Sequence, residues 1–340
     1  MKPTRLGKKI LFNGAFLAVL AGILTPILNA AADPVSDLRS LSALKDVDLS
    51  KLSGGNVSAA GEPLGLLARG MSVQSAYVVR LPVKSTVSLI QQWNPARHPD
   101  LRIYLQGDLP SGGGPQSFRS LASAPSNSSV RAFVEATERL PGDSSKLQLS
   151  SAEVKQFSGG TSGGGAVPGP VVAFWSQVLA QRARDFLSGG GLGAQPPYQN
   201  GVSPASEVAR LIDNSGNARS HFSPIISGGR GSPSLSWQLF DADGQAAVSL
   251  EAFYVKSVGD GYQTLDLGFY SSGGYYVVVT LQQLWPVQVT GRDATLVWRV
   301  DLVSSGAFAG LRGAGRLGSG AAMMRQIQKN VTAFVRDADR

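Results

Sequence analysis

The sequence predicts an α+β fold: a curved antiparallel sheet, made of an N-terminal strand plus a five-stranded meander, gripped by a long C-terminal helix. Apolar and polar residues alternate along five segments between residues 235 and 302, which is the period of strands with one buried face. A further alternating segment over 71–81 precedes them, and an amphipathic helix over 321–335 follows them. A large helical insertion is expected at approximately 95–232, so residues 71–340 are predicted to form a single domain.

The domain is expected to begin with a strand that leads through Pro82 into a helix over 83–93. Proline suits the first helical turn because its missing N–H would have no intrahelical partner there, and Asn94-Pro95 ends the helix. Within the insertion, we expect helices over 128–140, 171–187 and 203–212, and a short helix that starts at the capping-box pattern of Ser150 and Glu153.

Turn chemistry predicts the register of the meander. Three two-residue turns, at 243–244, 259–260 and 291–292, contain glycine. Each would place apolar residues opposite apolar residues, and a slip by one residue would turn every side chain over. The expected pairs are Leu239 with Val248, Trp237 with Leu250, Tyr254 with Leu265, Ala252 with Leu267, Trp285 with Trp298 and Val287 with Leu296. We therefore expect the strands to share one apolar face, covered by the C-terminal helix.

Residues 1–32 are typical of a signal peptide. A basic start precedes a mostly apolar run over 10–28, and Ala30-Ala31-Ala32 offers a cleavage site. An uncleaved anchor is the alternative, because the run approaches the length that spans a bilayer. We expect an exported protein, periplasmic or secreted, without a stable transmembrane span after signal removal. Residues 33–70 lack sustained periodicity and are expected to be a flexible N-terminal segment.

Composition excludes several kinds of site. The chain has no Cys and two His, so thiolate chemistry is excluded and a multi-His metal site is not expected. The net charge is +8, but four of the 31 basic residues lie in the first 32 residues, which contain no acid, so the rest of the chain carries +4. Nucleic acid is therefore not expected as a partner. No cofactor and no metal is predicted.

The order of elements resembles the START and birch-pollen-allergen-like helix-grip superfamily. The residues that carry the resemblance are Ala76-Tyr77-Val78-Val79-Arg80-Leu81-Pro82-Val83 and the block 235–336, about half of the chain beyond residue 32. The resemblance implies a sheet that closes around an apolar cavity, with the terminal helix as a lid. It also implies ligands such as lipids, sterols or polyketides.

Candidate ligand-binding residues lie on the expected apolar face, on the terminal helix and in the loop before it. Aromatic residues supply apolar area and a polar group, methionine suits a deformable lid, and a loop Arg can meet an anionic head group. An ordinary packed core and a solvated loop are the alternatives for these positions. The candidates are Trp237, Tyr254, Trp285, Trp298, Met323, Ile327, Arg312 and Arg316.

Three other motifs are weaker. The G-x-S-x-G string at 160–164 lies in a Gly-rich stretch without a preceding strand, so we interpret it as a flexible loop rather than a nucleophile. The Asp241-Ala-Asp243-Gly244 segment lacks the later calcium ligands and is expected to be a hairpin turn. His98, two residues before Asp100, could act as a general base or simply hydrogen-bond the backbone.

The sequence thus favours an exported, non-catalytic protein that binds an apolar or amphipathic, lipid-like small molecule in a cavity between the sheet and the C-terminal helix. One alternative is a cell-envelope interaction or scaffold protein with a filled core, whose helical insertion docks a protein partner. A hydrolase or cyclase that uses His98 and Asp100 is a third hypothesis.

Overall fold

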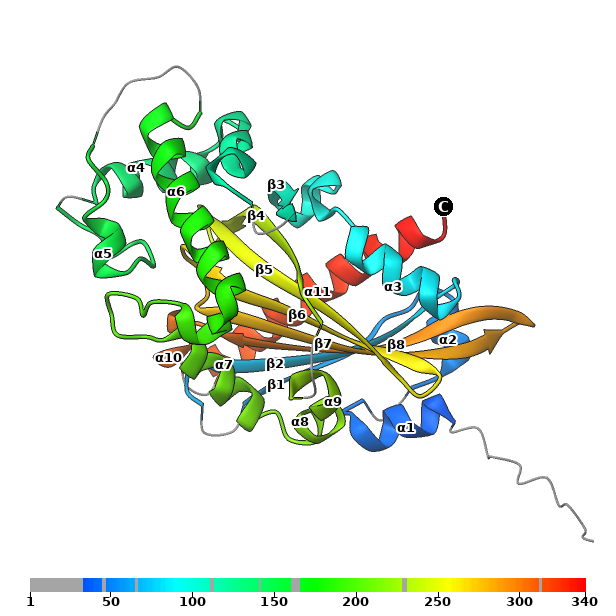
Figure 1. Ribbon diagram of the computed structural model, residues 1–340. Coiled ribbons are helices and arrows are strands. Elements are labelled where there is room, and N and C mark those ends of the chain that lie inside the picture. Colours follow the sequence, from blue (N-terminus) through cyan, green and yellow to red (C-terminus); the bar gives the residue numbers. More distant parts are fainter. Residues whose placement is uncertain are drawn as a thin grey trace, which may run out of the picture. The chain divides into compact units, whose positions relative to one another are not determined.

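One antiparallel sheet organises the computed structural model of the protein, which describes residues 33–44, 47–64, 67–110, 113–140, 142–159, 166–227, 231–311 and 314–340 (Figure 1). Eight strands are found in these residues, in the order β1-β2-β8-β7-β6-β5-β4-β3. They are β1 (Ser58–Pro63), β2 (Gly70–Val79), β3 (Ile103–Asp108), β4 (Ser234–Ala242), β5 (Gln245–Val258), β6 (Gly261–Ser271), β7 (Val277–Val289) and β8 (Arg292–Ser304). The α+β class, the N-terminal strand and the meander are confirmed.

The helices fall into three groups along the chain. The first group lies before β3 and comprises α1 (Pro34–Leu41), α2 (Leu49–Ser53) and α3 (Val83–Gln92). The second comprises α4 (Ser128–Glu138), α5 (Ser151–Val154), α6 (Gly169–Asp185), α7 (Pro204–Asp213), α8 (Asn217–His221) and α9 (Ser223–Ile226). After the sheet come α10 (Gly306–Ala309) and the long α11 (Ala314–Ala338). The expected helices over 83–93, 128–140, 171–187 and 203–212 are present, and Ser150 and Glu153 form the expected capping box.

Two of the three predicted hairpin registers are confirmed. Trp237 pairs with Leu250 across β4 and β5, and Ala252 pairs with Leu267 across β5 and β6. The third is wrong by two residues, because Trp285 pairs with Leu296 and the turn lies at Thr290-Gly291. Both turn residues have positive φ, 49° and 75°, as a type I′ turn requires. Moving a two-residue turn by one position shifts the register by two, so every side chain keeps its face.

The two faces of the sheet have different covers. The helix-covered face carries Trp237, Leu250, Leu267 and Trp298, which are at most 2% exposed and belong to one hydrophobic cluster with residues of α4, α6, α7, α8 and α9. Aromatic contacts join the layers: the ring of Phe222 lies 5.3 Å from that of Trp298. This face holds most of the buried core.

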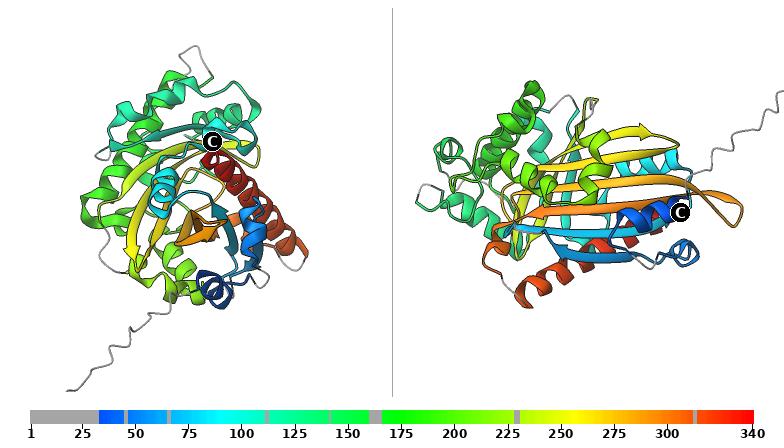
Figure 2. Two further views of the ribbon diagram at one scale, coloured as in Figure 1. Left: turned by 90° about the vertical axis from the view of Figure 1, so that its right-hand side faces the viewer. Right: turned by 90° about the horizontal axis from the view of Figure 1, so that it is seen from below.

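The cavity face is the opposite side, named for the cavity described below, and it is covered by α3 and α11. A second hydrophobic cluster joins Ile327, Val331 and Phe334 of α11 to Val73 and Tyr77 of β2. In Figures 1 and 2, α11 runs along the sheet on the side away from α6 and α7. The sequence therefore predicted the apolar stripe of the helix correctly but assigned it to the wrong face.

Three expectations are corrected by this arrangement. The C-terminal helix does not cover Trp237, Leu250, Leu267 and Trp298, because the helices within 95–232 already occupy that face. The helical insertion is thus the second layer of the core. Residues 33–70 are not simply a flexible segment, since they form α1, α2 and the edge strand β1. No helix in the described part of the chain has the length and apolar character of a membrane span.

Candidate functional site

A cavity of about 850 Å³ lies between the cavity face of the sheet, α3 and α11. This volume falls within the usual range for small-molecule sites. Part of the wall is apolar, with Ile90 and Trp93 from α3 and its end, Phe253 from β5, and Met323 and Ile327 from α11. The sheet supplies a polar floor instead. The walls and floor together give the cavity an amphipathic lining.

Acidic side chains lie in the middle of that floor. Alternation along β5 and β6 buries Leu250, Ala252, Leu265 and Leu267 on the helix-covered face, so the residues between them, Glu251 and Asp266, line the cavity. These positions are neighbours across the β5–β6 pair, where Glu251 lies opposite Gly268 and Asp266 opposite Phe253. The two carboxylates are therefore brought to one place by strand register.

The two carboxylates differ in their partners. Glu251 accepts hydrogen bonds from Gln238 Nε2 at 3.1 Å, from Ser249 Oγ at 3.2 Å and from Ser236 Oγ at 3.5 Å. Asp266 accepts none and forms no salt bridge with any residue of the described part, and it lines the cavity, where it is partly exposed. Asp266 is thus an acceptor at the cavity without a protein donor in these residues.

The nearest cation is already engaged. Arg299 on β8 donates from Nε and Nη2 to the two carboxylate oxygens of Asp301 at 2.8 and 2.7 Å. Thr280 also donates to Asp301, at 2.8 Å. Arg299 acts on Asp266 through space and lowers its pKa, but it makes no direct bond to it. The pair of Arg299 and Asp301 thus forms a closed unit beside the open carboxylates.

Burial changes the proton affinity of both open carboxylates. Removal from water raises the pKa of Asp266 to about 6, against the opposing effect of Arg299. Removal from water, reinforced by the charge of Asp266, raises the pKa of Glu251 to about 8. These shifts favour a protonated Glu251 carboxyl at neutral pH.

The far end of α11 is fastened to the loop after α3. Asp337 Oδ2 lies 2.7 Å from His98 Nε2 and accepts a hydrogen bond from Trp93 Nε1 at 3.0 Å. These bonds lower the pKa of Asp337 despite its partial burial. Trp93 also packs its ring edge-on against Phe334, with 5.5 Å between centroids. The fastening closes one end of the helix onto the wall of the cavity.

This fastening corrects the proposed pairing of His98 with Asp100. His98 bonds Asp337 on α11, whereas Asp100 lines the cavity. His221, the other histidine, lies 2.9 Å from Gln283 Oε1 and packs against Trp298. His98 therefore has a carboxylate partner, Asp337 rather than Asp100, but it is not among the residues that line the cavity, and His221 is bonded to an amide.

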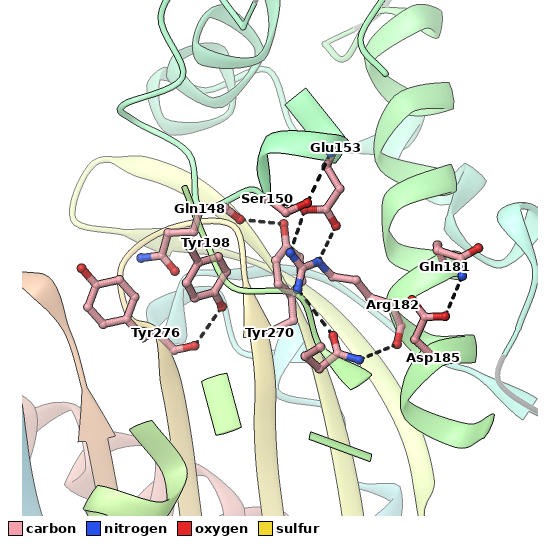
Figure 3. Close-up of polar contacts among 10 residues, drawn as sticks. Gln148, Ser150, Glu153, Gln181, Arg182, Asp185, Tyr198, Tyr270 and Tyr276 are labelled. Carbon is pink, nitrogen blue, oxygen red and sulfur yellow. Dashed lines mark hydrogen bonds and ion pairs between the residues drawn. The ribbon is translucent and has the colours of Figure 1, made fainter. Parts of the chain in front are cut away.

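A second buried polar cluster occupies the other side of the sheet (Figure 3). Arg182 of α6 is 1% exposed and donates to both carboxylate oxygens of Glu153, each at 2.7 Å. Its guanidinium lies 4.1 Å from the ring centre of Tyr270, and Gln195 Nε2 donates to its carbonyl oxygen at 3.0 Å. Every charge in this cluster has a partner, and we assign it a structural role: it ties α5 and α6 to β6.

The candidate residues from the sequence are divided between the two faces. Met323 and Ile327 line the cavity as expected. Trp237 and Trp298 are fully buried on the opposite face, and Tyr254 and Trp285 are partly buried against the same cluster. Those four do not meet α11, because their strand positions point to the helix-covered face.

The remaining sequence motifs add little to the site. Arg316 belongs to α11 rather than to a loop, and Arg312 lies outside the described residues, as does the G-x-S-x-G string at 160–164. Asp243-Gly244 forms the expected hairpin turn, with φ of 57° and 88°. Within the described residues, no group of three or more His, Asp or Glu side chains is placed to hold a metal ion.

Sequence reasoning missed the acidic floor. Glu251, Asp266 and Asp301 occupy the polar positions of alternating strands, which are ordinarily solvent-exposed. One signal was present: Asp is disfavoured inside strands, yet Asp266 stands between two leucines in the middle of β6. A charge at the centre of a long strand, together with a further amphipathic helix later in the chain, indicates that the polar face of the sheet is also covered.

Comparison with models of known protein families gives no match, and comparison with curated protein sequences gives none either.

Proposed function

We propose that the chain binds an amphipathic small molecule, without chemistry, in the cavity between the sheet and α11. The observation that carries this proposal is a cavity of about 850 Å³ whose floor is carboxylate-rich and whose walls are partly apolar. A concave space of this size that combines apolar side chains with a few polar groups is the usual form of a small-molecule site.

The arrangement of α11 supports the same proposal. Its apolar stripe, Ile327, Val331 and Phe334, packs against β2, and Met323 and Ile327 also line the cavity. A helix that covers the sheet and borders the cavity in this way suits a lid, as the START-like resemblance implies. We keep that resemblance as part of the proposal, together with a lipid-like apolar portion of the ligand.

Export remains part of the proposal as well. It rests on the signal-peptide pattern of residues 1–32, which lie outside the described residues. Expression of the full chain in a Gram-negative host, followed by fractionation and intact-mass measurement, tests it. A periplasmic protein that begins near Asp33 is the expected result, whereas an uncleaved cytoplasmic protein would contradict export.

The ligand proposal is tested on the purified protein by native mass spectrometry and by analysis of its organic extract. We expect a co-purifying molecule of a few hundred daltons that is released on unfolding. Met323→Trp, which places a larger side chain in the cavity, should reduce ligand occupancy.

Arg325→Trp is the matched control, because Arg325 is an exposed residue of the same helix and does not line the cavity. Equal occupancy in the two variants would locate the ligand elsewhere. A protein that never carries or takes up a small molecule would contradict the proposed function.

A further inference from the structure

The charged groups around the cavity are unevenly distributed. Six of the described lining residues are acidic and three are basic, although the whole chain carries a net charge of +8. The acids are Asp100, Asp241, Asp243, Glu251, Asp266 and Asp301, and the bases are Arg102, Arg299 and Lys329. An acidic cavity in a basic protein favours a ligand of positive charge.

The partners of these groups sharpen the inference. Asp301 is neutralised by Arg299, and Asp241 accepts hydrogen bonds from Tyr104, at 3.0 Å, and Ser129, at 2.5 Å. Asp266 alone in the floor has neither a hydrogen-bond donor nor a salt-bridge partner in the described part of the chain. The buried Oε1 of Gln106, in the cavity wall, also lacks a partner there. Asp266 and Gln106 Oε1 are therefore acceptors at the cavity lining without a protein donor in the described residues.

Aromatic rings lie beside the open carboxylates. Phe253 follows Glu251 by two residues and lines the same face of β5. Tyr275 lies close enough to Glu251 for the carboxylate to raise the pKa of the phenol, after the larger effect of burial. Tyr275 is itself stacked on Phe240, with 5.5 Å between ring centres. Carboxylates combined with aromatic faces are the usual environment of a bound ammonium group.

Building on the proposed function, we propose that the ligand is an organic cation, an alkylamine or alkylammonium. Its charged head lies between Asp266 and Glu251, and its apolar chain lies along Trp93, Met323 and Ile327. An anionic head group at this place would meet the two carboxylates and Arg299, which Asp301 already neutralises. The other two bases of the lining, Arg102 and Lys329, come from outside the sheet. A neutral head group would leave the charge of Asp266 without a partner.

The protonation of the floor links binding to pH. The groups that face the two carboxylates are Arg299 and Asp301 on β8, Tyr275 before β7, and Gln238 and Ser236 on β4, with Lys329 on α11 at the lining. Because burial raises the pKa of Asp266 to about 6 and that of Glu251 to about 8, a cation must displace protons from the floor near neutral pH. Affinity for a cation should therefore rise with pH between about 6 and about 8.

Three probes of equal chain length test the proposal by isothermal titration calorimetry below their micelle concentrations: decyltrimethylammonium, decanoate and decanol. At pH 8 we expect the cation to bind at least about tenfold more tightly than decanoate. Its affinity should fall by about tenfold or more at pH 6. Titrations at pH 7 in phosphate and in Tris should differ in enthalpy by the amount that proton release predicts.

Asp266→Asn is the informative variant because the carboxylate makes no protein hydrogen bond in the described residues, so its loss leaves the fold intact. We expect at least about a tenfold loss of affinity for the cation and no loss for decanol. Glu251→Gln should reduce the affinity less and flatten the pH dependence. Asp260→Asn, in the exposed β5–β6 turn, is the matched control and should bind as the wild type does.

The outcomes separate this inference from the proposed function. Equal binding of all three probes, with no effect of Asp266→Asn, would overturn the cationic ligand and leave a lipid-like pocket in place. Tighter binding of decanoate than of the ammonium would overturn it in the same way. If none of the probes binds and no small molecule co-purifies, both proposals are contradicted.

Discussion

The two buried polar clusters on opposite faces of the sheet contain the same kinds of residue in different states. On the helix-covered face, Arg182 and Glu153 form a two-bond salt bridge, closed further by Gln195 and Tyr270 (Figure 3). On the cavity face, Asp266 has no bonded partner in the described residues and lies beside an open volume. Every charge of the Arg182 cluster has a protein partner, whereas the carboxylate of Asp266 has none in the described residues.

The difference separates a structural charge from a functional one. A buried charge is tolerated when its partners satisfy it, and then it mainly fixes geometry. A buried charge left without partners lowers stability, and proteins retain such groups chiefly where function requires them. Burial of an ionisable residue is therefore weak evidence of a site by itself. Burial next to a cavity, without a partner, is the stronger indication.

Breaking the Arg182 cluster should have the largest effect. Glu153→Gln leaves the guanidinium of Arg182 buried without its counter-charge, and the expected loss in the free energy of unfolding is about 3–5 kcal/mol. Urea unfolding followed by circular dichroism measures it. Cation binding in the cavity should be unchanged in the folded fraction, because the sheet separates the two clusters.

The control is Glu135→Gln, which breaks the exposed pair of Glu135 and Arg139 on α4. Both side chains are more than half exposed, at 61% and 59%, so the expected change is within about 0.5 kcal/mol. If the two glutamate variants were equally stable, the structural role of the Arg182 cluster would be wrong.

Removing the charge of Asp266 on the cavity face should raise the stability of the protein instead of lowering it. The folded pKa of Asp266, about 6, is above its unfolded value near 3.8, so the folded state holds the proton more tightly. Its contribution to stability is fully present below about pH 4 and is lost as the pH rises through about 6. Asp266→Asn removes this loss. We expect the variant to be more stable than the wild type by about 1–2 kcal/mol at pH 8, after allowance for water in the cavity.

Thermal or urea unfolding of wild type, Asp266→Asn and Asp260→Asn at pH 4, 6 and 8 checks the sign. The first two proteins should converge at pH 4 and diverge as the pH rises, and Asp260→Asn should follow the wild type. Glu251→Gln should extend the same behaviour through about pH 8. A variant Asp266→Asn that is less stable at every pH would mean that the carboxylate is a structural partner after all.

The same comparison explains what the sequence could predict. Strand alternation and turn chemistry are local, so they identified the meander and the shared face of Trp237, Leu250, Leu267 and Trp298. They also identified the apolar stripe of the last helix. The shift at Thr290-Gly291 shows the limit of local turn rules: Gly291 fits either central position of a two-residue turn, and only the pairing of whole strands decides between them.

Which helix covers which face is not a local property. The insertion supplies apolar side chains such as Phe174 and Trp175 to the larger apolar face, and α11 packs on the other side. The sequence-based prediction placed α11 on the apolar face of the meander. It had no means of judging that the helices within 95–232 would cover that face instead. The acidic floor was not predicted for the same reason, because the polar face of the strands was expected to be exposed to solvent.

The smallest expected effect concerns the bonds that hold the end of α11 to the loop after α3. These bonds bear on how a ligand enters the cavity beside Asp266. Asp337→Asn weakens the bonds of Asp337 to His98 Nε2 and Trp93 Nε1, which are 2.7 and 3.0 Å long, and should cost about 1 kcal/mol locally. Hydrogen exchange of the amides in the last two turns of α11 should then quicken by about fivefold, while the amides of β6 keep their protection. Asp339→Asn, at an exposed position just after the end of α11, should leave exchange unchanged.

Equal exchange in the two variants would mean that Val331 and Phe334 alone hold the helix. In that case ligand entry would require the apolar stripe itself to separate from β2, and release of decyltrimethylammonium should be as slow in Asp337→Asn as in the wild type.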